Sequence, residues 1–199
     1  AGADPKRARE HQLSPLDHAH RYGSAELVDA YLDAGHPLTV VAAARLGRVE
    51  ELTSLLEEGA EIDSSEMDLT GRSPIQLAIE NDETGAVEVL IDHGVDPTAT
   101  LPTWDKRTPL HIAATRSNAR STELLLRHGA DPNLADRVGR TPLYDAVSLG
   151  RERTVRVLLE SGADPNLAPA GESILDFART EKLRDLLIEF GARSLADER

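Results

Sequence analysis

The stretch Thr108-Pro109-Leu110-His111, followed by Gly129-Ala130-Asp131, decides the fold of this chain. The same unit returns as Thr141-Pro142-Leu143 with Gly162-Ala163-Asp164, and a weaker copy begins at Ser73-Pro74-Ile75. A period of about 33 residues is the signature of stacked supersecondary units that bury their apolar surfaces only against their neighbours. Because such arrays usually act by presenting a surface, the pattern favours binding over catalysis.

Each unit carries the start and stop signals of a helix pair. Thr108 and Thr141 offer a hydroxyl to the free N–H groups of a first helical turn. Pro109 and Pro142 stand at the first helical position, where no N–H group is missed. Glycines follow the second helix of each pair, where a left-handed residue ends it; they are Gly35, Gly59, Gly94, Gly129, Gly162 and Gly191. The sequence therefore predicts a row of helix pairs.

These residues resemble the ankyrin repeat family, whose signature tetrapeptide is reproduced in full at 108–111. The resemblance implies an all-α solenoid of stacked helix-turn-helix repeats with short β-hairpin fingers, and a non-enzymatic, protein-binding function. We expect a polar N-terminal segment over 1–13, a single repeat domain over 14–193 and a tail over 194–199. The expected units are 14–35, 38–59, 73–94, 108–129, 141–162 and 173–191.

Two units depart from this pattern. The second has Leu38-Thr39-Val40-Val41 in place of the Pro-containing start, and it follows Gly35 too closely for a finger. The last lacks about three residues between its helices, around 179–182, and terminal repeats are commonly atypical because they meet water on one side. Two fingers, near 64–70 and 98–106, are longer than the others and should project further.

In ankyrin-like proteins the contact residues lie at finger tips, just before the Thr-Pro-Leu start and at the end of the inner helix. Arginine recurs at these positions, and its planar fork binds carboxylates in pairs of hydrogen bonds. One interpretation is a concave groove for an acidic partner; the other is that a basic residue before the Thr-Pro start is common in the family. The candidate partner-binding residues are Tyr22, Arg45, Leu69, Arg72, Trp104, Arg107, Arg116, Arg137, Arg140 and Leu149.

Trp104 is the only tryptophan of the chain and falls at the tip of a longer finger. Tryptophan is enriched among residues that dominate binding energy at interfaces, because it buries a large area at little entropic cost. The alternative is that its ring packs on Leu101 and Pro102 within its own loop. We expect Trp104 to anchor the partner.

Charge divides the chain into two blocks. The net charge of −13 argues against nucleic-acid binding, which needs a basic footprint. Residues 49–98 contain fourteen acids and one base, whereas 105–160 contain ten bases and seven acids. Two alternatives to simple partner binding follow. The acidic block, 50–96, could cover the basic cleft of an enzyme, as an inhibitor or immunity-type protein would. The two blocks could instead join copies of the chain in a salt-sensitive assembly, although we expect a monomer.

No residue pattern indicates chemistry. The chain has no cysteine, and no apolar run approaches the roughly 18 residues of a membrane span. His18 and His20 would point to nearly opposite sides of a helix, a poor pair for a metal. His111 resembles the structural histidine of the ankyrin family. We therefore expect no metal, no cofactor and no catalytic residue, and a cytoplasmic protein, although a signal peptide already removed would leave no trace.

Overall fold

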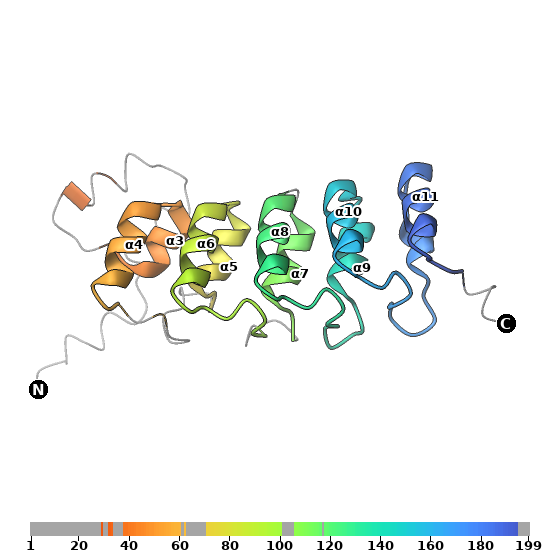
Figure 1. The fold of residues 1–199 in the computed structure, drawn as a ribbon, viewed down its shortest axis with the longest axis horizontal. Coiled ribbons are helices and arrows are strands. Elements are labelled where there is room, and N and C mark those ends of the chain that lie inside the picture. The colour runs from red at the N-terminus through yellow and green to blue at the C-terminus, as the bar shows by residue number, and fades with distance from the viewer. Residues whose placement is uncertain are drawn as a thin grey trace, which may run out of the picture.

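A computed structural model describes residues 29, 32, 33, 38–60, 62, 71–100, 106–116 and 118–194. Over these residues, helix pairs stand side by side in one row along the long axis of the molecule (Figure 1). The pairs are α3 (Val40–Leu46) with α4 (Val49–Glu57), α5 (Pro74–Glu80) with α6 (Thr84–Asp92), α7 (Pro109–Thr115) with α8 (Ala119–Arg127), and α9 (Pro142–Ser148) with α10 (Glu152–Glu160); the 3₁₀ helix η2 (Ile174–Phe177) and α11 (Glu181–Glu189) follow.

The first helix of each pair begins where the sequence signals place it. Ser73 and Thr141 accept hydrogen bonds through their hydroxyls from the backbone N–H groups of Gln76 (3.4 Å) and Tyr144 (3.2 Å). The irregular start of α3 keeps the same device without proline, because the Thr39 hydroxyl accepts from the N–H of Ala42 at 3.2 Å. A capping hydroxyl is therefore sufficient to start these helices.

The helices form two layers. The inner layer is the succession α3, α5, α7 and α9, each in contact with the next, and the outer layer is α4, α6, α8 and α10. Alanines at matching places of the inner helices are fully buried, as at Ala78 and Ala113, and leucines such as Leu90 and Leu158 fill the space between layers. Burial of one such leucine contributes about 2 kcal/mol. The core is thus one continuous strip along the row.

His111 joins neighbouring units. Its Nδ1 accepts from the backbone N–H of Thr108 at 3.1 Å, and its Nε2 lies 3.0 Å from the carbonyl oxygen of Arg140 in the next finger. Because Nδ1 is an acceptor, Nε2 carries the proton and donates to that carbonyl. Burial lowers the pKa of this imidazole, so the neutral ring is the form that fits. The structural role implied by the family resemblance is confirmed.

The described finger at 129–140 is built from a turn. The N–H of Asp136 donates to the carbonyl of Arg140 at 2.8 Å, and the Asp136 carboxylate accepts from the N–H groups of Val138 and Arg140 at 2.9 and 3.0 Å. Because one side chain takes these donors, they cannot extend a strand ladder. The all-α solenoid is confirmed, and its fingers, within the described residues, are turns without β-strands.

The last unit is shortened as the sequence suggested. A four-residue 3₁₀ helix, η2, replaces the seven-residue inner helix of the preceding units. The Ser173 hydroxyl still caps its start by accepting from the N–H of Leu175 at 3.3 Å. The irregularity therefore lies in the inner helix, while α11 keeps the full nine residues of an outer helix.

Candidate partner-binding surface

Three arginines stand one residue before the caps of successive inner helices, but two of them are ion-paired inside the protein. Arg72 contacts the carboxylate of Glu80 at the other end of α5, with 2.5 Å between Nη1 and Oε2. Gln76 donates to the second oxygen of Glu80 at 3.3 Å. The charge of Arg72 is thus balanced within its own unit.

Arg107 forms an ion pair between units. Its guanidinium donates to the carboxylate of Asp145 on α9, and the two side chains are only 18% and 9% exposed. Burial raises the pKa of Asp145 to about 6, since the loss of hydration outweighs the attraction of Arg107. The Nε of Arg107 is buried and makes no hydrogen bond within the described part of the chain. This pair joins the segment before α7 to α9, and its formation costs the hydration of both charged groups.

Arg140 lies over an aromatic ring. Its guanidinium carbon is 5.9 Å from the centre of the Tyr144 ring, within the range of a cation–π contact. The Tyr144 hydroxyl donates to Glu172, the residue before the next cap, at 2.5 Å, and its ring packs against Phe177. Burial and the Glu172 carboxylate raise the pKa of this hydroxyl to about 12. Arg140 itself remains exposed.

The other candidates lie at the edges of the inner layer. Arg45 and Arg116 are half-buried at the ends of α3 and α7, and neither makes an ion pair with a described residue. Arg137 is exposed on the finger before α9, and Leu149, which follows α9, is 46% exposed. The remaining candidates, Tyr22, Leu69 and Trp104, lie outside the described residues.

Sequence reasoning missed the acids that hold the arginines. Asp145 occupies the place in its unit that Leu77 and Ile112 occupy in theirs, and all three are buried. A charged residue at a position that is apolar in the other repeats is a signal visible in the aligned units. The candidate set also omits apolar side chains that are exposed on the fingers, Val138 (59%) and Leu167 (40%).

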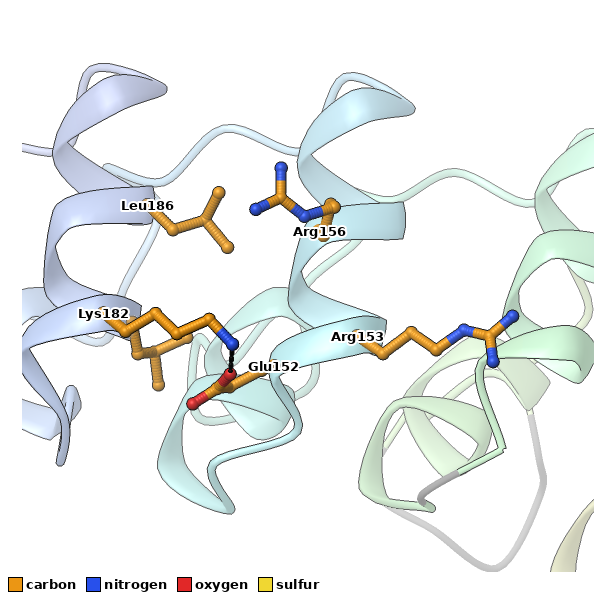
Figure 2. Close-up of a pocket in the computed structure, with 6 residues that line it drawn as sticks. Glu152, Arg153, Arg156, Lys182 and Leu186 are labelled. Atoms are coloured by element: carbon orange, nitrogen blue, oxygen red, sulfur yellow. Dashed lines mark hydrogen bonds and ion pairs between the residues drawn. The ribbon is translucent and has the colours of Figure 1, made fainter.

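Cavities lie between outer helices. One of about 360 Å³ separates α10 from α11, and Figure 2 shows Arg153, Arg156 and Lys182 around it, with Lys182 paired to Glu152. A second, of about 490 Å³, lies between α8 and α10. Within the described ranges, no three His, Cys, Asp or Glu side chains converge as a metal site, and no helix there is long and apolar enough to cross a membrane.

The architecture defines a helical repeat protein, in which an inner layer and its fingers form an extended surface. The family model described as ankyrin repeats (3 copies) matches residues 16–101 and 101–168. The chain therefore belongs to the ankyrin repeat family, whose repeats are generally protein–protein interaction modules. No curated protein matches the sequence.

Proposed function

We propose that this chain is a non-enzymatic module that binds a partner protein through the edges of its inner helices and its fingers. The family supports the general role, since ankyrin repeats bind other proteins. The arrangement of charge on the inner layer supports the choice of surface.

The proposal rests on arginines of the inner layer whose charge is not balanced by an acid within the described residues. Glu80 and Asp145, two acids of the inner helices, are held by Arg72 and Arg107. Arg45 and Arg116 have no such partner among the described residues, and Arg140 is exposed above an aromatic ring. The inner edge thus keeps a positive excess on a chain whose net charge is −13. An acidic protein surface is the complementary partner.

Exposed apolar side chains next to these cations would supply the contact area. Leu149 and Val138 are 46% and 59% exposed, and they lie at the two ends of α9, the first after the helix and the second on the finger before it. Interfaces combine apolar anchors with a charged rim, and Trp104, Leu69 and Tyr22 remain the sequence-based candidates for further anchors. Catalysis has no part in this proposal.

An affinity capture with matched variants tests the proposal. The wild-type chain and the triple variant Arg45→Glu, Arg116→Glu, Arg140→Glu are used as baits in an extract of the source cell. We expect the triple variant to bind the captured partner more than about tenfold more weakly, about 1.4 kcal/mol. Arg193→Glu, an exposed charge reversal near the end of the row, should leave binding unchanged. Equal capture by wild type and triple variant would contradict the proposal.

A second candidate function rests on the exposed acids of α4 and α6. Glu88 and Asp92 are exposed and make no ion pair with a described residue, which suits contact with the basic cleft of an enzyme. The same capture separates the two functions. Reversal of Glu88 and Asp92 to arginine would abolish binding of such an enzyme and leave the binding of an acidic partner intact.

A further inference from the structure

The outer layer carries opposite charge at its two ends. The segments α4 and α6 contain five acidic residues and no basic one. The next two outer helices, α8 and α10, contain four arginines and three glutamates. Since the outer helices lie next to one another in one layer, an acidic half and a more basic half share a single face.

Two arginines of the basic half lie in the first turn of a helix, where a positive charge lowers the stability of the helix. Arg120 and Arg153 are the second residues of α8 and α10. A cation in the first turn of a helix opposes the positive end of the helix dipole. Both side chains are exposed, and neither forms an ion pair with a described residue, as is also true of Arg127. An external anionic group would account for their placement.

Two cavities flank α10 on the surface of the basic half. The cavity between α8 and α10 combines Leu126 and Val157 with Arg120 and Arg127. The cavity between α10 and α11 combines Leu183 and Leu186 with Arg156 and with the ion pair of Lys182 and Glu152, while the Arg153 side chain points away from α11 (Figure 2). The cavity between α8 and α10 is also lined by Glu123, and its two arginines give it an excess of positive charge that suits contact with acidic helices.

We propose that the outer faces of two copies of this chain bind each other about a two-fold axis that runs parallel to the outer helices. Such an axis reverses the row, so that α4 faces α10 of the second copy and α6 faces α8. It keeps the helix direction, so that equal positions meet. Asp92 and Arg127 are both the ninth residues of their helices, and Glu50 and Arg153 are both the second.

Charge decides between the possible two-fold arrangements. An axis along the row would place α4 on α4 and bring acid against acid. The axis parallel to the helices makes each contact twice, as a closed two-fold interface requires. It also places two like-charge pairs, Glu88 opposite Glu123 and Glu57 opposite Glu160, so the dimer is weak and sensitive to salt. The inner surface proposed for the partner protein stays open.

Sedimentation of the purified full chain tests this interface. At about 0.05 M salt we expect a concentration-dependent dimer that dissociates at about 0.5 M, where charges are screened beyond roughly 4 Å. Asp92→Arg and Arg127→Asp should each weaken the dimer at least about tenfold, because each change creates two like-charge contacts. An equimolar mixture of these two variants should restore it, since both contacts between positions 92 and 127 then pair opposite charges.

Asp176→Arg is the matched control: it makes the same charge change at an exposed residue of η2, in the inner layer. We expect this variant to dimerise like the wild type. A monomer at all concentrations in low salt would overturn the inference, as would a dimer that survives Asp92→Arg or a mixture that stays monomeric. Because no partner protein is present, failure here is distinguishable from failure of the proposed function.

Discussion

The unit formed by α5 and α6 and the unit formed by α9 and α10 have the same backbone plan and differ in what they bury. The first has Leu77, fully buried, at the place where the second has Asp145. The first makes its ion pair at the edge, through a 36% exposed Arg72, whereas the second makes it between units, through Arg107. A repeat fold therefore tolerates a charged residue at a buried position of an inner helix where the residue before the preceding inner helix supplies the counter-charge.

This difference has an energetic consequence. Replacement of a buried ion pair by apolar residues is often neutral or stabilising, but removal of one member is strongly destabilising. The α9 unit should thus depend on a single side chain of the preceding unit more than the α5 unit does.

The largest expected effect is that of Arg107→Ala. This change leaves the Asp145 carboxylate buried without its counter-ion, and we expect a loss of about 3–5 kcal/mol at neutral pH, measured by urea unfolding. Arg72→Ala should cost about 1 kcal/mol or less, because Arg72 is partly exposed and Gln76 still holds Glu80.

The double variant Arg107→Leu with Asp145→Ile completes this experiment. It gives the α9 unit an apolar residue at the place of Leu77 and Ile112, so its stability should approach or exceed that of the wild type. A double variant as unstable as Arg107→Ala would show that Arg107 does more for the fold than neutralise the buried charge of Asp145.

The second effect is a pH dependence of the α9 unit that comes from Asp145, at the place where the α5 unit has the non-titrating Leu77. The pKa of Asp145 is about 6 in the fold against an ordinary 3.8, so between these values the folded chain binds a proton that the unfolded chain does not. Its contribution to stability is therefore present below about pH 4 and is lost as the pH rises through 6. A shift of about two units corresponds to at most about 3 kcal/mol.

Asp145→Asn isolates this contribution. The lowered pKa of His111 acts in the opposite direction, so the useful quantity is the difference in unfolding free energy between wild type and variant. We expect this difference to shift against the wild type by about 2–3 kcal/mol from about pH 4 to about pH 7. An unchanged difference across that range would show that the Asp145 carboxylate is not desolvated as described.

The smallest effect concerns the turns between the helices of the same two units. Asp82, after α5, and Gly150, after α9, both have positive φ, 62° and 67°. Gly150→Ala should cost about 1 kcal/mol, whereas Asp82→Gly should change stability by a few tenths, in the stabilising direction. Thermal unfolding of the two variants measures the contrast, and equal destabilisation by both would refute the assignment of these turns.

Much of this fold could be predicted from the sequence, because its signals are local. The caps at Ser73 and Thr141 and the glycines that end the outer helices fix where helices start and stop, and the repeat period fixes how they stack. The deficit of about three residues in the last unit was visible in the sequence, but it was expected between the helices, around 179–182, whereas the structure places it in the inner helix. The absence of strands in the described finger was not, because it depends on how Asp136 shares its hydrogen bonds.

The site was less predictable for a physical reason. Position in the repeat identified Arg72, Arg107 and Arg140 as a series, but it could not tell which of them meets an acid. Arg107 finds its partner 38 residues further along the chain, and only the stacking of α7 against α9 brings them together. The series that looked like one ladder of contact residues is two internal ion pairs and one exposed cation.

Footprinting of the complex with the captured partner tests whether the inner helices and fingers form the binding surface. Hydroxyl-radical labelling of the chain, alone and bound, reports which side chains the partner covers. We expect protection at Val138 and Leu149 on the inner and finger side, with Leu126 and Val157 on the outer layer unchanged at dilutions where the chain is monomeric. Protection confined to the outer helices, with Val138 and Leu149 as reactive as in the unbound chain, would contradict it.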